Sequence, residues 1–310
     1  ALMGVMVNDV NLEALASGQT VFDEAVRATQ LEQASGLASR WHGRANGRIQ
    51  AVMAATGLST SSPQLLQGLR DVADDMRIPI SIHLGFGERE LVQNIHGMAQ
   101  FDYAAAHGML GSDVVAVHCF EVDDTEIEIL AQSGTHLAHC PHMNQFRGEV
   151  APIQAMRAKG MHVGLGIDNY FSDYFEVLRS CLASARIHAH DPQVLCAPEA
   201  LALGTIHAAR VLGLDKEIGS IEVGKKADLQ MVNMHRLGLT PINDPVATLV
   251  YHGHAKDVEM VMVNGKIVVA DGSVQTADER DLLNRAGIAA NAAWKRFAER
   301  YGAFVAPAPT

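Results

Sequence analysis

Groups that can bind a metal or move a proton stand at the ends of several short apolar segments. His83 lies near the end of PISIHL, His118 near the end of DVVAVHC, and Asp168 ends MHVGLGID, while His139 and His142 belong to THLAHCPH. A single histidine would carry little weight, because the chain has 15 of them. Placed together at one edge of a sheet, these imidazoles and the carboxylate form a ligand set that suits a divalent cation such as Zn²⁺.

A site of this kind supports hydrolysis. Bound Zn²⁺ lowers the pKa of its water toward about 7, so that hydroxide forms near neutral pH. A carboxylate can accept the proton, and a histidine can orient the water or stabilise the developing charge. Asp168 and His118 fit these two roles. The same donors also suit Fe²⁺ or Mn²⁺, so the sequence leaves the metal open.

Six segments rich in branched apolar residues alternate with segments of helical spacing, a pattern typical of an α/β protein with a parallel sheet. We expect strands at 2–7, 48–54, 79–84, 113–119, 135–140 and 161–168. Helices are expected at 20–40, 62–76, 88–107, 123–132 and 150–159, followed by a helix-rich stretch over 172–214. This order predicts a TIM-type (β/α)₈ barrel, whose chemistry lies at the C-terminal strand ends. A barrel has eight strands and only six are found, so we expect two to be missing at the front.

Beyond residue 218 the pattern changes to short strands joined by Asn-Gly and Asp-Gly turns. SIEVGKKADLQMV, ATLVYHGHAKDVEMVMVNG and KIVVADGSV are interpreted as such strands. We therefore expect a barrel over 1–218, a small β-sandwich segment over 219–275, and a C-terminal helix and tail over 276–310.

The bulk composition narrows the classes of partner. The 310 residues are 48% hydrophobic, enough for a large core, and the net charge of -11 argues against nucleic acid. The four cysteines form no CxxC pair, which is typical of a reducing compartment. We find no apolar run of membrane-spanning length and no signal peptide. We therefore expect a cytoplasmic protein that binds no membrane. Unpaired strand edges would favour a homo-oligomer. Cys119 and Cys140 alternate with site histidines, so we expect both to point away from the site.

The segments HLGFGERE, VAVHC, SGTHLAHCPHMN and GLGIDN, in this order and spacing, resemble the amidohydrolase superfamily. The similarity is to its branch of cytosine and guanine deaminases and triazine hydrolases. GSIEVGKKADL and VEMVMVNGKIVVADG are similar to the family's β-sandwich region. The resemblance implies a metal-bearing barrel with a β-sandwich. It also implies hydrolytic removal of an amino or chloro group from a nitrogen heterocycle such as a purine, pterin, pyrimidine or triazine.

Residues carried over from the family motifs have the following implied roles. His83 would be a metal ligand on the fifth barrel strand, and His118 would contact the attacking water or a second metal. Asp168 would be both ligand and proton shuttle. His142 and Asn144, in the loop after the seventh strand, would touch the substrate.

The first departure from the family is the lack of an HxH motif on a strand near the start. HAH at 188–190 falls in an expected helix and HGH at 252–254 in the β segment. Either the sequence is truncated or the site is unusual, and we expect truncation. Two alternatives stay open. The chain could be an inactive fragment that binds no metal, or it could be a relative that cleaves peptide or lactone bonds.

The second departure concerns the acid. The family's HxxE pattern places Phe86 where its glutamate would stand, so Glu88 or Glu90 would have to replace that acid, and Glu88 could equally be a helix-start residue. Phe86 could instead stack on a flat substrate ring. Asn169 could bind a substrate carbonyl or amine, or only its own backbone.

Two further features lie in loops near these residues. Arg147 could pair with an anionic substrate group, although a solvated loop cation is the commoner case. Tyr170 and Phe171 are more typical of packing residues at a helix start.

Overall fold

The computed structural model describes residues 1–169 and 172–302. The chain forms two compact units, one of residues 1–226 with 234–255, the other of residues 227–233 with the segment from 256 onward. The expected boundary between 218 and 219 stays a prediction. Among the described helices, none combines the length and the apolar character that a membrane span needs.

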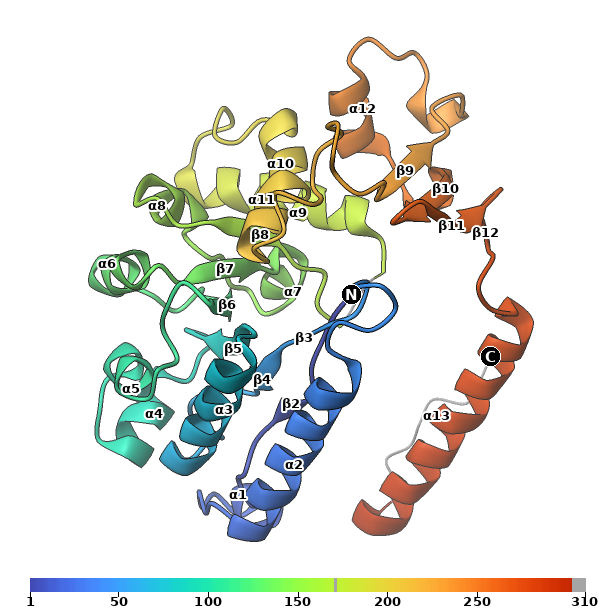
Figure 1. The fold of residues 1–310 in the computed structure, drawn as a ribbon. Coiled ribbons are helices and arrows are strands. Elements are labelled where there is room, and N and C mark those ends of the chain that lie inside the picture. Colours follow the sequence, from blue (N-terminus) through green and yellow to red (C-terminus); the bar gives the residue numbers. More distant parts are fainter. Residues whose placement is uncertain (170–171, 303–310) are drawn as a thin grey trace. The chain divides into compact units, whose positions relative to one another are not determined.

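A six-stranded parallel sheet organises the first unit (Figure 1), and its strands follow one another in chain order. They are β2 (Met6–Val7), β4 (Met53–Ala55), β5 (Ile80–Leu84), β6 (Val114–His118), β7 (His136–His139) and β8 (Val163–Leu165). The short strands β1 (Leu2–Met3) and β3 (Gln50–Ala51) pair with each other. All six predicted strands are confirmed, the first two in two pieces each. In the described residues β2 and β8 are the edges of this sheet, which thus holds six of the eight strands of a TIM-type barrel.

Helices follow the strands as the α/β pattern predicts. They are α1 (Leu12–Ala16), α2 (Glu24–Trp41), α3 (Pro63–Met76), α4 (Arg89–His96), α5 (Gln100–Ala106), α6 (Asp124–Ser133), α7 (Pro141–Phe146), α8 (Ile153–Ala158), α9 (Tyr174–Ala189), α10 (Ala197–Leu203) and α11 (Ile206–Val211). The helix expected at 88–107 is two helices, because Gly97 ends α4 in the left-handed conformation with φ of 69°. The short α7 was not predicted; Pro141 opens it.

Alternation along β5 decides which side chains enter the core. Ile80, Ile82 and Leu84 are at most 1% exposed, whereas Ser81 and His83 face the other side and are half-buried. Helix α3 packs on this part of the sheet and buries Leu65, Leu66 and Leu69. The apolar residues thus hold the sheet against its helices, and the half-buried positions are left for chemistry.

One predicted strand is a helix. The first residues of ATLVYHGHAKDVEMVMVNG belong to helix α12 (Pro245–His252). The helix forms because the Asp244 carboxylate accepts hydrogen bonds from the amides of Val246 and Ala247, and because Pro245 suits the first turn. The HGH motif therefore begins at the end of this helix and not in a β segment. The 3₁₀ helices η1 (Leu237–Leu239) and η2 (Ala255–Asp257) flank α12 in the sequence.

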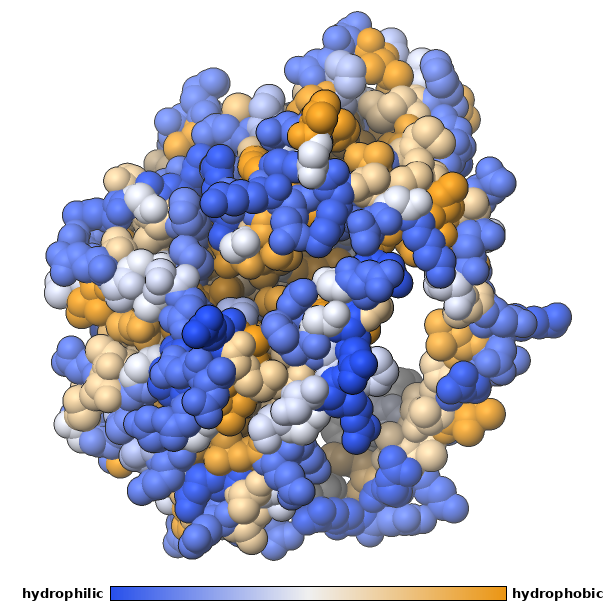
Figure 2. All heavy atoms as spheres, viewed as in Figure 1, coloured by the Kyte–Doolittle hydropathy of each residue, from blue (hydrophilic) through white to orange (hydrophobic). Residues whose placement is uncertain are grey.

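The second unit contains an antiparallel sheet with the strand order β12-β11-β10-β9. Its strands are β9 (Leu229–Val232), β10 (Val258–Val263), β11 (Lys266–Ala270) and β12 (Ser273–Val274). This sheet confirms a small C-terminal β segment. The helix α13 (Glu279–Tyr301) follows, and its apolar side chains Leu283 and Ile288 are exposed; hydrophobic atoms are visible along this helix in Figure 2.

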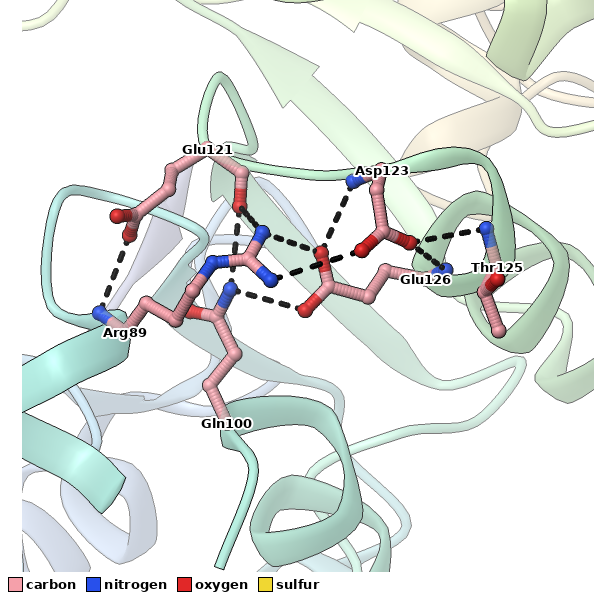
Figure 3. A network of polar contacts seen from close by, with 6 residues as sticks. All are labelled: Arg89, Gln100, Glu121, Asp123, Thr125 and Glu126. Atoms are coloured by element: carbon pink, nitrogen blue, oxygen red, sulfur yellow. Dashed lines mark hydrogen bonds and ion pairs between the residues drawn. The ribbon is translucent and has the colours of Figure 1, made fainter.

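A polar network joins the starts of helices α4 and α5 to the loop after β6 and to helix α6 (Figure 3). The Arg89 guanidinium donates to the Glu126 carboxylate at 2.7 Å and to the Glu121 carbonyl at 3.3 Å. Gln100 donates to the same carbonyl and to Glu126. Glu126, only 8% exposed, also closes the capping box of α6 with Asp123. The network therefore fixes the chain that leads away from both strand ends.

We predict that Arg89→Met lowers the free energy of unfolding by about 1–3 kcal/mol, because the buried Glu126 carboxylate would lose its cationic partner. Urea unfolding measures this change. Lys159→Met is the control, because it removes an ion pair with Glu128 that lies at the surface. An equal loss of stability in both variants would contradict a structural role for the network.

Candidate active site

The imidazole of His83 is held by a backbone carbonyl of the neighbouring strand segment. Its Nδ1 lies 2.5 Å from the Thr56 carbonyl oxygen at the end of β4. A carbonyl only accepts, so Nδ1 carries a proton, and in the neutral form of the ring the lone pair is on Nε2. Histidines that bind metals are commonly oriented by such a bond from the other ring nitrogen.

His118 reaches His83 through an unusual backbone conformation. The register of β5 and β6 pairs His83 with Val117 and Leu84 with His118, so regular strands would point the two imidazoles to opposite faces. His118 has φ of 74° and Cys119 has φ of 46°, in the left-handed region that non-glycine residues rarely adopt. The two imidazole rings lie stacked with their centres 5.1 Å apart.

Gly85 allows the two loops to meet. A Cβ there would lie 2.9 Å from the Val122 side chain and 3.1 Å from the Glu121 carbonyl oxygen, and φ is 57°. The chain after β5 therefore requires glycine at this position. The first glycine of HLGFG has a packing role, and it brings the loops after β5 and β6 together.

His118 also contacts Asn144 and Asp168. Its Nδ1 is 2.9 Å from the Asn144 side-chain oxygen, and its Nε2 is 3.4 Å from an Asp168 carboxylate oxygen. Burial lowers the pKa of His118 to about 4, so the ring is neutral at pH 7 and Nδ1–H donates to Asn144. Two acceptors, the Nε2 lone pair and the carboxylate, then face each other without a proton between them. A cation fits this arrangement.

Cys140 is the main correction to the expected site. We expected its side chain to point away, but its sulfur lies with the donor atoms of His118 and Asp168, all within 4.8 Å of one another. The strand β7 ends at His139, so alternation no longer fixes the direction of the next side chain. Burial raises the pKa of Cys140 to about 12, which keeps it a neutral thiol at pH 7.

Phe86 lies against both histidines. Its ring centre is 4.3 Å from that of His118 and 5.3 Å from that of His83. The Arg147 guanidinium lies 4.3 Å from the centre of the Phe86 ring. The aromatic ring at the HxxE position thus separates a cation from the histidine pair, and a role for Phe86 in substrate binding stays a prediction.

The carboxylate of Glu88 is engaged by the backbone of a neighbouring loop. Its two carboxylate oxygens accept hydrogen bonds from the amides of Leu58 and Ser59, at 3.2 and 2.9 Å. The residue is 7% exposed and precedes α4. In this arrangement Glu88 orders the loop after β4, and a catalytic role for it stays a prediction.

The remaining expected residues are distributed as follows. His142 contacts the Ser180 hydroxyl on α9 at 2.8 Å. Asn169 is exposed, and its amide donates to the Asp168 side chain at 2.6 Å. Asp168 itself has φ of 59°. Tyr170 and Phe171 lie outside the described residues. The structure thus brings His83, His118, Asn144, Phe86 and Asp168 together.

His139 is a buried group whose surroundings the sequence could not reveal. It is 1% exposed, and neither ring nitrogen has a hydrogen-bond partner among the described residues. Burial lowers its pKa to about 3. In the sequence, the one sign that His139 lies near the site was its position at the end of the strand that the structure shows as β7.

A comparison with known families now adds to this geometry. Residues 4–268 match the model of the amidohydrolase family. The chain belongs to the amidohydrolase family. The resemblance inferred from the sequence motifs is therefore confirmed.

Curated relatives of the chain are deaminases. A 5-methylthioadenosine/S-adenosylhomocysteine deaminase of Moorella thermoacetica is 36% identical over 260 residues, 82% of this chain and 61% of that protein. A 5'-deoxyadenosine deaminase of Methanobrevibacter smithii is 32% identical over 272 residues, 85% and 62% of the two chains. The chain thus spans about 61% of the length of these relatives.

Solved structures support the fold. An adenosine deaminase of Xanthomonas campestris with bound zinc matches with a TM-score of 0.81 and 24% identity, over 94% of this chain and 65% of that one. Guanine deaminase of E. coli matches with a TM-score of 0.75 and 21% identity, over 86% and 63%. The α/β fold of amidohydrolases is confirmed.

The buried histidines predict the pH dependence of stability. The unfolded chain binds a proton on His139 near its ordinary pKa of about 6.5, whereas the folded chain does so only near 3, so stability falls as the pH decreases between these values. His139→Gln should reduce the slope by about 1.4 kcal/mol per pH unit below pH 6. Urea unfolding of the metal-free protein at pH 7, 6 and 5 measures it. An unchanged slope, or an equal change in the exposed-site control His188→Gln, would contradict the assignment.

Proposed function

We propose that this amidohydrolase removes an amino or chloro group from a nitrogen heterocycle by hydrolysis with a divalent metal. The observation that carries the proposal is the pair of facing acceptors, His118 Nε2 and the Asp168 carboxylate, with His83 stacked beside them. Relatives that deaminate adenosine derivatives support the substrate class. Purines, pterins, pyrimidines and triazines are the candidate rings.

The residues that would hold the metal are His83, His118 and Asp168. A divalent metal, most simply Zn²⁺, supplies a Lewis acid that makes water acidic enough to react at neutral pH. The free Nε2 lone pair of His83 and the neutral imidazole of His118 suit such an ion. The sulfur of Cys140 lies within 4.8 Å of the ligand atoms of His118 and Asp168, so it would be close to such an ion.

The protein side chains would then divide the proton transfers. Asp168 accepts the proton of the attacking water and returns it to the leaving group. Asn144 fixes the orientation of the His118 ring through the bond to Nδ1, so that Nε2 faces the reacting centre. The buried surroundings of His118 strengthen its interaction with the charge that develops on the ring nitrogen.

Metal content tests the ligand set. We expect about one divalent metal per chain by elemental mass spectrometry, and its loss in His83→Ala but not in His188→Ala, an exposed histidine of α9. Chelator should abolish ammonia release from adenosine, and added Zn²⁺ should restore it. A parent protein without metal would support the inactive alternative, and turnover that resists chelator would contradict the mechanism.

Asp168→Asn tests the proton transfer. The amide cannot accept the proton, so kcat should fall by about 10²–10⁴-fold, while Asp75→Asn, at an exposed position of α3, leaves kcat unchanged. Initial rates on adenosine, pterin and triazine substrates measure the effect. A variant that retains metal and full kcat would remove Asp168 from the proton path. Turnover of dipeptides or lactones by the parent, without turnover of the heterocycles, would favour the other substrate class.

A further inference from the structure

Arg147 is a cation beside the site whose charge has no partner in the described part of the chain. It follows α7, and its exposed side chain lies over the Phe86 ring with the guanidinium carbon 4.3 Å from the ring centre. Its guanidinium nitrogens form no ion pair or hydrogen bond with the described residues. A chain with a net charge of -11 offers many carboxylates. An arginine without one at this edge of the sheet therefore calls for an explanation.

Several other arginines of the first unit are paired with a carboxylate. Arg89 contacts Glu126 at 2.7 Å, Arg70 contacts Asp113 at 2.6 Å, and Arg179 contacts Glu176 at 2.6 Å. Their charges are used within the fold. The Arg147 charge is available to a ligand.

The stacked geometry orients Arg147 for recognition. A guanidinium that lies over an aromatic ring keeps its edge of N–H donors free, and this edge binds a carboxylate with two parallel hydrogen bonds. Phe86 also lies 4.3 Å from the His118 ring. Arg147 is thus separated from His118 by one aromatic ring.

Asn144 provides a second, independent sign of a polar ligand. Its side chain is 1% exposed, and its Nδ2 group has no acceptor among the described residues, although Oδ1 is used by His118. A buried donor left without a partner is costly, so a ligand atom at this place would be favourable. The backbone carbonyl of Asn144 accepts a hydrogen bond from the Arg147 amide at 3.0 Å. The side-chain donors of Asn144 and Arg147 therefore belong to one short turn.

We propose that the heterocyclic substrate carries a carboxylate and that Arg147 binds it. This inference rests on the proposed function, because it names the substrate of the same site. A carboxylate fits better than a phosphate monoester, because the single guanidinium over Phe86 balances one negative charge. Arg147 is thus a specificity-determining residue, and the bond that is hydrolysed stays on the ring.

Binding of matched ligand pairs to the purified, zinc-supplemented chain tests the inference by calorimetry. The pairs are adenosine 5'-carboxylate with adenosine 5'-carboxamide, and pterin-6-carboxylate with pterin-6-carboxamide; adenosine 5'-monophosphate tests phosphate. We expect at least one carboxylate to bind about tenfold more tightly than its amide. Arg147→Gln should remove this preference, Arg147→Lys should keep part of it, and Arg40→Gln, at an exposed position of α2, should not change it.

Each outcome separates this inference from the proposed function. Equal binding of carboxylates and amides, no binding of any ligand, or a preference that persists in Arg147→Gln would overturn the inference. Tighter binding of the phosphate than of both carboxylates would overturn it as well. Ammonia release is measured on the same ligands. Turnover of the amides without a carboxylate preference would leave the proposed function intact, and a carboxylate preference without any turnover would contradict the proposed function alone.

Discussion

The site depends on a backbone conformation that the parallel sheet itself does not provide. Strand register pairs His83 with Val117, so the two imidazoles would lie on opposite faces if β6 continued regularly. The left-handed conformations of His118 and Cys119 bring the rings together. Such a conformation costs about 1–3 kcal/mol for a non-glycine residue and persists only where neighbouring interactions enforce it. Here the Cys119 amide donates to the Leu84 carbonyl and the Glu121 amide to the Gly85 carbonyl.

Burial of the side chains around the site sets their charges. His118 and His139 are neutral because burial lowers their pKa, and Cys140 is neutral because burial raises its pKa. Beside these neutral groups lie the Asp168 carboxylate and the Arg147 guanidinium. A neutral imidazole keeps a lone pair for a cation, which a protonated one could not do. The desolvated interior thus sets the protonation states that the proposed chemistry requires.

Much of the fold could be predicted from the sequence because its signals are local. Branched apolar segments predicted all six strands, and their chemistry-bearing ends predicted which side of the sheet carries the site. The error at α12 has a local cause too: ATLVYH is apolar enough for a strand, and the capping signal of Asp244 and Pro245 decides for a helix.

The rest of the site depends on interactions between distant segments. Cys140 joins the donor group because the strand ends one residue earlier. Glu88 accepts hydrogen bonds from amides that lie 30 and 29 residues before it in the chain. The spacing of residues in the sequence does not predict that Phe86 stacks with His118 and Arg147. Positive φ values at His118 and Asp168 are equally invisible, since neither residue is a glycine. Motif resemblance supplied the identities of these residues, and only the structure supplied their contacts.

The distribution of the four thiols offers a practical handle on this molecule. Cys119, Cys140 and Cys181 are buried, whereas Cys196 is exposed at the start of α10. Alkylating reagents attack an accessible thiolate, and burial both shields the three inner sulfurs and raises their pKa. A maleimide dye would therefore attach at one defined surface position of the folded chain. The buried sulfurs become reactive only when the structure around them opens, so the rate of their labelling reports local opening after β6, at the start of α7 and in α9.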